Sequence, residues 1–135
     1  MEAYKDIIYH PFSAKTGDVT VRVQPIYLDV HSNIAQKKFV FSYLIKIENG
    51  GRQAFQLLRR HWYIEDARGS IEEVSGDGVV GLTPHIQSGC DFEYNSFCIL
   101  KTPSGKMWGE YTCVYPDGEE FIIRIPEFLL EMSNN

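Results

Sequence analysis

The sequence predicts an all-β protein built as an antiparallel sandwich of seven to eight strands. Three observations predict it. Apolar residues alternate with a period of two along most of the chain, and Gly, Pro, Asn or Asp bounds the alternating runs. No segment between these runs has helical periodicity, so the pattern favours hairpin-connected strands over parallel strands joined by helices.

The expected elements follow in chain order. Val19, Val21 and Val23 alternate, and the apolar parity then shifts after Pro25, which suggests a bulge or break before residues 26–30. Further strands are expected at residues 39–47, 54–66, 71–74, 92–100, 106–115 and 121–125. The chain lacks the Cys-Trp-Cys pattern of antibody domains. The strand spacing is therefore typical of a more general immunoglobulin/fibronectin type III-like sandwich.

The chain of 135 residues is expected to form a single domain. Residues 1–18 are predicted to be a flexible N-terminal arm, residues 19–130 the β-sandwich, and residues 131–135 a C-terminal tail. Exposed edge strands leave homodimerisation open.

Composition narrows the function classes. The net charge of −5 gives no reason to expect nucleic acid, and the apolar runs are too short for membrane insertion. The first residues carry acids and do not resemble a secretory signal. Cys90, Cys98 and Cys113 are an odd number without C-x-x-C spacing, so we expect a cytoplasmic protein with three buried thiols.

Residues 76–81, here called the glycine loop, form a G-x-G-x-x-G hexapeptide with Gly76, Gly78 and Gly81 as its glycines. A dinucleotide site needs a helix directly after such glycines, but Pro84 follows closely and prevents one of useful length. Asp77 would also repel a phosphate. We therefore expect a strand connection whose valines anchor it in the core, with ligand or protein recognition by the loop as the alternative.

A second motif is the run 59–62, which reads Arg-Arg-His-Trp. Strand parity places Arg60 and Trp62 on one face with Leu58, and His61 on the other face with Leu57. One interpretation is that Trp62 fills the core while the Arg60 head pairs with a carboxylate such as Glu48 or Glu72. The other is an exposed aromatic and arginine recognition patch.

The sequence predicts no metal site, no cofactor and no catalytic residue. The four histidines stand far apart without metal-ligand spacing, although a weak site joining His85 and Asp77 in space stays open. No serine lies in a G-x-S-x-G motif and no cysteine in a nucleophile motif. If the chain were an enzyme, hydrolysis of phosphoanhydrides would be the most plausible chemistry.

Several segments in combination resemble the ApaG family. They are residues 41–43, 47–49, 56–62, 66–69, the glycine loop with Pro84, 102–109 and 125–130. The resemblance spans roughly residues 19–130. It implies a fibronectin type III or immunoglobulin-like sandwich in a bacterial protein associated with cobalt resistance and magnesium efflux, by a mechanism that is not established. Related domains in eukaryotic F-box proteins and in a polymerase-interacting protein imply a partner-binding module.

Together these arguments predict a non-enzymatic protein-interaction module whose protein partner is unidentified. The candidate contacts are the glycine loop and the aromatic hairpin around Trp108, with Arg60, His61 and Trp62 as the further recognition patch. The alternative function is a small-ligand or nucleotide/pyrophosphate-binding protein that uses the glycine loop.

Overall fold

The computed structural model describes residues 11–132 and shows nine strands with no α-helix in that range. The strands are β1 (Phe12–Thr16), β2 (Val19–Tyr27), β3 (Phe39–Asn49), β4 (Phe55–Asp66), β5 (Ile71–Asp77), β6 (His85–Ile86), β7 (Asp91–Leu100), β8 (Ser104–Val114) and β9 (Glu120–Glu131). Two short 3-10 turns, η1 (Asp29–His31) and η2 (Ile34–Gln36), connect β2 to β3. No helix in the described part of the chain is long and apolar enough to cross a membrane.

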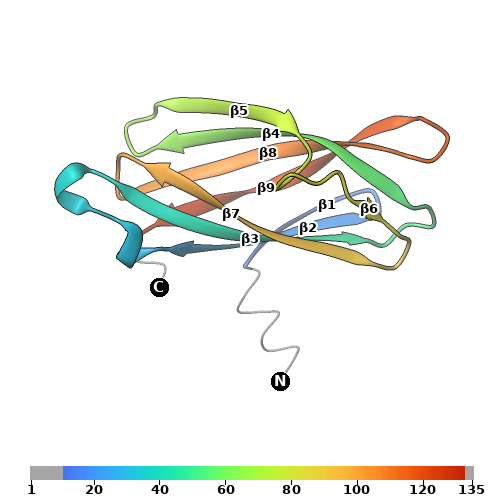
Figure 1. The fold of residues 1–135 in the computed structure, drawn as a ribbon, viewed down its shortest axis with the longest axis horizontal. Helices are drawn as coiled ribbons and strands as arrows, with labels where there is room; N and C mark the ends of the chain where they lie inside the picture. The colour runs from blue at the N-terminus through green and yellow to red at the C-terminus, as the bar shows by residue number, and fades with distance from the viewer. Residues whose placement is uncertain (1–10, 133–135) are drawn as a thin grey trace, which may run out of the picture.

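The strands form two antiparallel sheets that run along the long axis of the molecule (Figure 1). One sheet has the order β1-β2-β3-β7, and the other has the order β5-β4-β8-β9 with the short β6 also paired to β4. Alternate residues of β2, β3, β8 and β9 are buried between the sheets, as the period-two pattern predicts. The predicted all-β sandwich of the immunoglobulin/fibronectin type III kind is confirmed, with nine strands in the described residues where seven to eight were expected.

The sandwich begins earlier than expected. Residues 12–16 form β1, which pairs along its whole length with β2, so the expected arm does not extend to residue 18. The amide of Arg124 also donates a hydrogen bond to Thr16 Oγ1, which connects β1 to β9 of the other sheet. The rest of the predicted arm, residues 1–10, lies outside the described residues, as do residues 133–135 of the predicted tail.

The expected break at Pro25 is wrong. Strand β2 pairs with β3 without a register shift, and Pro25 and Tyr27 continue the inward alternation of the three valines before them. Ile26 therefore points outward. Strand β1 pairs only as far as Val23, so Pro25 lies where β2 is an edge strand, and a proline is tolerated there without a bulge.

A bulge in β4 changes the predicted faces of that strand. The pairing with β8 shifts between Leu57 and Arg59, so Leu58 has no direct partner in the ladder. Leu57 consequently lies on the inner face together with Arg60 and Trp62, and not with His61 as strict alternation predicted.

The two lateral sides of the sandwich differ. On one side β9 packs against β1 and β2, which brings the two sheets together. On the other side β5 and β7 are the last strands of their sheets, and the glycine loop begins in the last two residues of β5. This arrangement places the loop at the more open side of the sandwich.

Candidate functional site

The glycine loop folds as a tight strand connection. The backbone N–H groups of Val79 and Leu82 each donate to the carbonyl of the other, which closes a two-residue turn at Val80 and Gly81. Both central residues have positive φ, 45° for Val80 and 79° for Gly81, as type I′ turns require. Val79 is fully buried whereas Val80 is exposed, so only one of the two valines anchors the loop.

No helix follows the loop within the described residues, since the chain passes from Leu82 into the short strand β6. Its backbone donors are largely engaged: Gly78 donates to the carbonyl of Leu58, and Val79 and Leu82 bond each other. A dinucleotide cradle would need these N–H groups free and a helix end behind them. The predicted strand-to-strand connection is therefore confirmed.

Arg60 fastens the loop to the sandwich. Its Nη1 donates hydrogen bonds of 2.9 Å to the carbonyl oxygens of both Asp77 and Gly78. The guanidinium lies directly over Gly76, where an added Cβ would be 3.1 Å from Nη2. The predicted pairing of Arg60 with Glu48 or Glu72 is wrong, because the arginine binds backbone carbonyls instead.

The same guanidinium lines a polar crevice of about 280 Å³ at the open side of the sandwich. Its other walls come from the glycine loop and from the polar side chains of Tyr43, Tyr94 and Ser96. Beyond the two loop carbonyls, Arg60 has no further hydrogen-bond acceptor among residues 11–132. Guanidinium N–H groups therefore remain available to a small anionic group.

Burial raises the pKa of five ionisable groups in the core, three tyrosines and two cysteines. Desolvation raises the pKa of Tyr43, Tyr94 and Tyr111, and the hydroxyl groups of the last two are hydrogen-bonded to each other. Desolvation also raises the pKa of the Cys98 and Cys113 thiols to about 12. These two cysteines are buried as predicted. Cys90 is exposed, so the expectation of a buried thiol is wrong for that residue.

Trp62 and Trp108, which the sequence placed in one candidate patch, lie on opposite faces of their sheet. Trp62 is 3% exposed and packs edge-on against Tyr43 and Phe128 in the core. Trp108 lies half-buried on the outer face, stacked on Tyr63 with their rings 5.5 Å apart and nearly parallel. Trp62 is therefore a core residue, and Trp108 alone can contact a partner.

Charged side chains surround the Tyr63–Trp108 stack. The His61 ring lies 4.7 Å from that of Tyr63, and its Nε2 is 2.9 Å from Glu73 Oε1. On the other flank Lys106 Nζ lies 5.8 Å from the centre of the Trp108 ring. Lys106 also pairs with Glu127 at 3.4 Å. We call Tyr63, Trp108 and these flanking residues the aromatic face.

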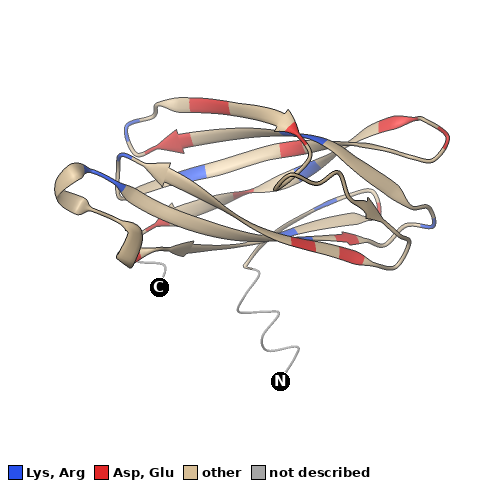
Figure 2. Cartoon of the chain, viewed as in Figure 1, with Lys and Arg blue, Asp and Glu red and all other residues tan. Residues whose placement is uncertain are grey.

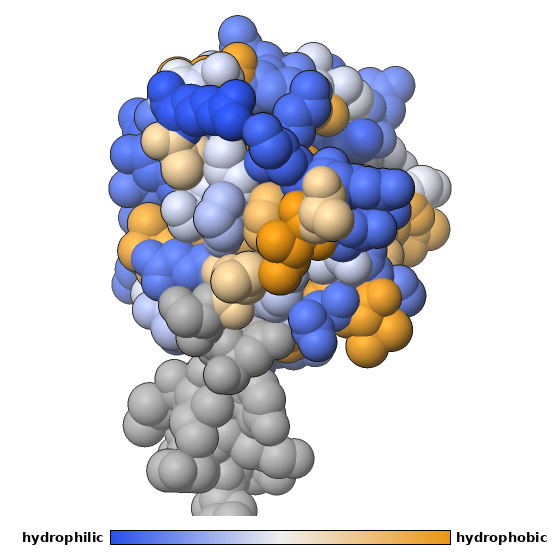
Figure 3. All heavy atoms as spheres, turned by 90° about the vertical axis from the view of Figure 1, so that its left-hand side faces the viewer, coloured by the Kyte–Doolittle hydropathy of each residue, from blue (hydrophilic) through white to orange (hydrophobic). Residues whose placement is uncertain are grey.

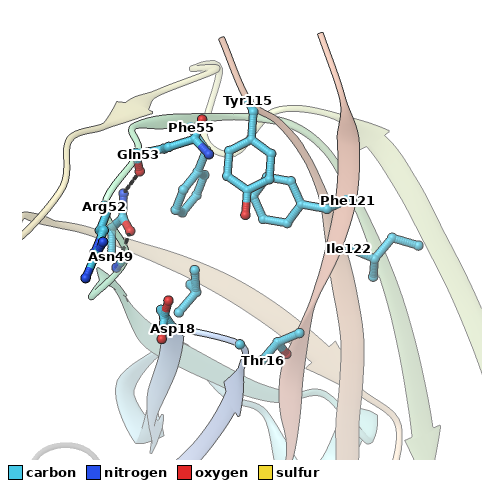
Figure 4. A pocket seen from close by; sticks show the side chains of 12 residues that line it. Thr16, Asp18, Asn49, Arg52, Gln53, Phe55, Tyr115, Phe121 and Ile122 are labelled. Carbon is cyan, nitrogen blue, oxygen red and sulfur yellow. Dashed lines mark hydrogen bonds between the residues drawn. The ribbon is translucent and has the colours of Figure 1, made fainter. Parts of the chain in front are cut away.

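A further hollow lies away from both candidate sites, between the β1–β2 turn, the β3–β4 loop and the β8–β9 hairpin. It has a volume of about 450 Å³. In Figure 4 the aromatic rings of Phe55, Tyr115 and Phe121 form one part of its wall, with Thr16 and Asp18 opposite. Asn49 organises this end by donating from Nδ2 to the carbonyls of Gln53 and Ile86. The hollow brings no catalytic constellation together.

Residues 11–132 contain no group of three or more His, Cys, Asp or Glu side chains arranged to hold a metal ion. The weak metal site that the sequence left open would join His85 and Asp77. His85 lies on β6 opposite Gln56, whereas Asp77 is the last residue of β5. His61 pairs with a single carboxylate.

These observations define a class of protein: an all-β sandwich domain with an aromatic outer face and an arginine-fastened loop at its open side. Comparison with known proteins then gives the family. The ApaG domain model matches residues 29–115, and the chain belongs to the ApaG family.

Relatives agree over almost the whole chain. The chain is similar to Protein ApaG of Paramagnetospirillum magneticum, with 46% identity over 120 residues, which are 89% of this chain and 92% of the relative. Protein ApaG of Ralstonia nicotianae is 46% identical over 115 residues, covering 85% and 93% of the two chains. A crystal structure of the ApaA protein from Bordetella pertussis matches with a TM-score of 0.84 and 43% identity, covering 87% of this chain and 96% of that one.

Sequence reasoning missed some residues of both sites. Tyr63 could have been found from strand parity, because it alternates with His61 on the outer face. Tyr94 and Ser96 carried no local signal, because their strand meets the glycine loop only through the tertiary fold.

Proposed function

We propose that this chain is a non-enzymatic domain that binds a protein partner through its aromatic face. The observation that carries the proposal is the flat stack of Trp108 on Tyr63 on the outer side of the sheet. Within residues 11–132, the two sheets are the only layers, and no third layer covers the outer side of β4 and β8. Large aromatic rings with a polar rim are the composition of interface hot spots, which favours protein recognition.

The charged rim supports the same function. Lys106, Glu127, His61 and Glu73 surround the stack with both signs of charge, which suits a polar interface that selects its partner by electrostatic complementarity. In each of these pairs the side chains retain solvent access, so they can exchange intramolecular for intermolecular contacts at small cost.

The absence of catalysis is part of the proposal. A nucleophile or general base needs a pKa moved toward neutrality, and the resolved shifts at Tyr43, Tyr94, Tyr111, Cys98 and Cys113 all move the pKa upward. Each of these groups is thereby held in its neutral, unreactive form near pH 7. The burial of these tyrosine and cysteine side chains supports a role in packing the core.

From the resemblance to the ApaG family we propose that this binding serves cobalt resistance and magnesium efflux in the cytoplasm. We propose that the partner handles the metal and that this domain binds the partner. A cobalt titration followed by NMR tests the division of roles. Saturable shifts at histidine or carboxylate resonances of the isolated domain would contradict it.

The central experiment is affinity capture from the source cell with three versions of the chain: the unchanged protein, Trp108→Ala and a control, Val30→Ala. Val30 is 91% exposed and lies in η1, away from the aromatic face. We expect Trp108→Ala to lose a specific partner that the control retains. Melting curves of the three proteins separate lost binding from lost folding. Retention of every captured protein by a folded Trp108→Ala variant would contradict the proposal.

A second candidate function rests on the Arg60 crevice. Val80 is a β-branched residue with φ of 45°, and such backbone strain concentrates at ligand sites. With the unused N–H groups of Arg60 it supports binding of a small anion, such as pyrophosphate or a nucleotide phosphate. Isothermal titration with pyrophosphate and ATP tests this candidate. Micromolar binding that disappears in Arg60→Met would support it, and flat titrations would remove it.

A further inference from the structure

Strand β7 leaves one edge of its sheet without a partner. It is last in the order β1-β2-β3-β7 and pairs only with β3 over the described residues. Its ten residues correspond to roughly 33 Å of strand, and a free edge presents a row of unpaired backbone donors and acceptors. Such an edge is a template for another strand.

Most of the strand lacks the usual protections against pairing. It has no proline and no lysine, and its register with β3 shows no bulge. Its two charged residues, Asp91 and Glu93, both lie within its first three positions. The neighbouring edge strand β5, by contrast, includes Glu72, Glu73 and Asp77 within seven residues. Strand β1, at the far edge of the β7 sheet, lies against β9. The edge of β7 is therefore the one open to an addition.

Apolar side chains flank this edge on the outer face of the sheet. Phe97 is 62% exposed and Ile99 is 61% exposed, although both belong to a regular strand. Figure 3 looks onto the end of the molecule at which β7 finishes, and it shows a group of apolar side chains among hydrophilic ones. Exposed aromatic and β-branched residues on a strand stabilise cross-strand pairs.

The charges along β7 are separated by sign. Glu93 lies near its start and Lys101 follows its last residue, and Figure 2 shows acidic colour near the start and basic colour beyond the end. Neither Glu93 nor Lys101 has an ion-pair partner within residues 11–132. An antiparallel copy of the same strand would bring opposite charges together at both ends.

We propose that β7 pairs with β7 of a second copy of this chain, antiparallel and centred on Phe97. In this register Phe97 lies opposite the partner's Phe97, and Glu93 lies opposite the partner's Lys101. The exposed aromatic residue is the midpoint between the two unpaired charges, so a single two-fold axis satisfies all three contacts. The two four-stranded sheets then continue as one sheet through the dimer.

This self-complementarity favours a second copy over an unrelated strand. A two-fold interface uses the same patch on both subunits. It therefore requires opposite charges at equal distances on either side of the axis, as Glu93 and Lys101 are placed about Phe97. The interface is a single strand pair, small by the standards of obligate dimers, so we expect reversible dimerisation with a Kd in the micromolar range. It is independent of the aromatic face, which belongs to the other sheet.

Sedimentation velocity on the full chain between roughly 1 and 500 µM, a range that brackets a micromolar Kd, measures the equilibrium. The informative variants are Glu93→Lys, Lys101→Glu and the double exchange. Each single exchange places like charges opposite each other twice in the symmetric dimer and should weaken it by about tenfold or more. The double exchange restores both pairs and should recover dimerisation.

Glu119→Lys is the matched control, because it makes the same change of charge at an exposed position in the turn between β8 and β9. It should leave the dimer unchanged. The proposal is overturned if the chain stays monomeric throughout the range or if Glu119→Lys weakens the dimer as much as Glu93→Lys. Failure of the double exchange to recover what both single exchanges lose would overturn the register.

Discussion

Replacing Arg60 by alanine tests how the glycine loop is held. The change removes two hydrogen bonds of 2.9 Å to the carbonyls of Asp77 and Gly78 and the contact of the guanidinium with Gly76. Hydrogen bonds from a charged donor contribute about 1.5–3 kcal/mol each when buried. Two fully buried bonds would thus contribute about 3–6 kcal/mol together. Because this guanidinium is partly solvated, we expect a smaller total loss, near 2 kcal/mol, in the free energy of unfolding.

The neighbouring arginine provides a matched control. Arg59 Nη2 lies 2.9 Å from Glu120 Oε1, but both side chains are about half exposed. Exposed ion pairs of this kind contribute between about 0 and 1 kcal/mol. Arg59→Ala should therefore be nearly neutral, although it removes the same charge from the adjacent position of the same strand.

Urea denaturation of both variants gives the comparison. A loss of about 2 kcal/mol corresponds to a fall of roughly 6–10 °C in melting temperature for a domain of this size. Amide hydrogen exchange should in addition become faster at Val79 and Leu82, whose N–H groups close the turn. Equal stability of the two arginine variants, with unchanged exchange in the loop, would refute the fastening role of Arg60.

Three further outcomes follow from the packing. Gly78→Ala should destabilise the fold by about 2 kcal/mol or more, because a Cβ would lie 2.1 Å from the Leu82 carbonyl oxygen at a φ of +61°; near-native stability in urea would count against this geometry. Trp62→Ala should cost about 3–5 kcal/mol by leaving a cavity in the core, and a loss below about 1 kcal/mol would show that Trp62 is not packed there. The free energy of unfolding should fall as the pH rises from about 9 to 12. In this range the folded state keeps the Cys98 and Cys113 thiols protonated, whereas the unfolded chain releases those protons. Each thiol contributes up to about 1.4 kcal/mol per pH unit in that window, so Cys113→Ala should flatten the alkaline slope, and an unaltered slope would contradict the assigned burial.

The glycine loop has a different role from the one that its sequence motif suggests. A G-x-G-x-x-G hexapeptide indicates phosphate binding only when a helix follows it. Here the glycines permit a two-residue turn and the close approach of the Leu82 carbonyl to Gly78. The capacity for an anion, where we propose it, comes from the Arg60 side chain and not from the loop amides.

Period-two alternation was sufficient to predict most strands and the sandwich, because burial of one sheet face requires that pattern wherever a strand forms. Along the predicted strand 39–47, the alternating residues Tyr43 and Ile45 are buried in the core. The same reasoning failed at Leu57, because a bulge at Leu58 reverses which residues face inward. A bulge depends on the pairing of β4 with β8, and no local residue pattern in β4 announces it.

By itself, the sequence determined the architecture, the absence of a helix after the glycine loop, and the resemblance that identified the family. Only the tertiary structure decided which side chains meet: Arg60 with the loop carbonyls, Tyr63 with Trp108, and Trp62 with the core. The reason is physical. Alternation is a local property of each strand, whereas contacts between residues distant in sequence depend on strand order and register, which the packing of the whole sandwich selects.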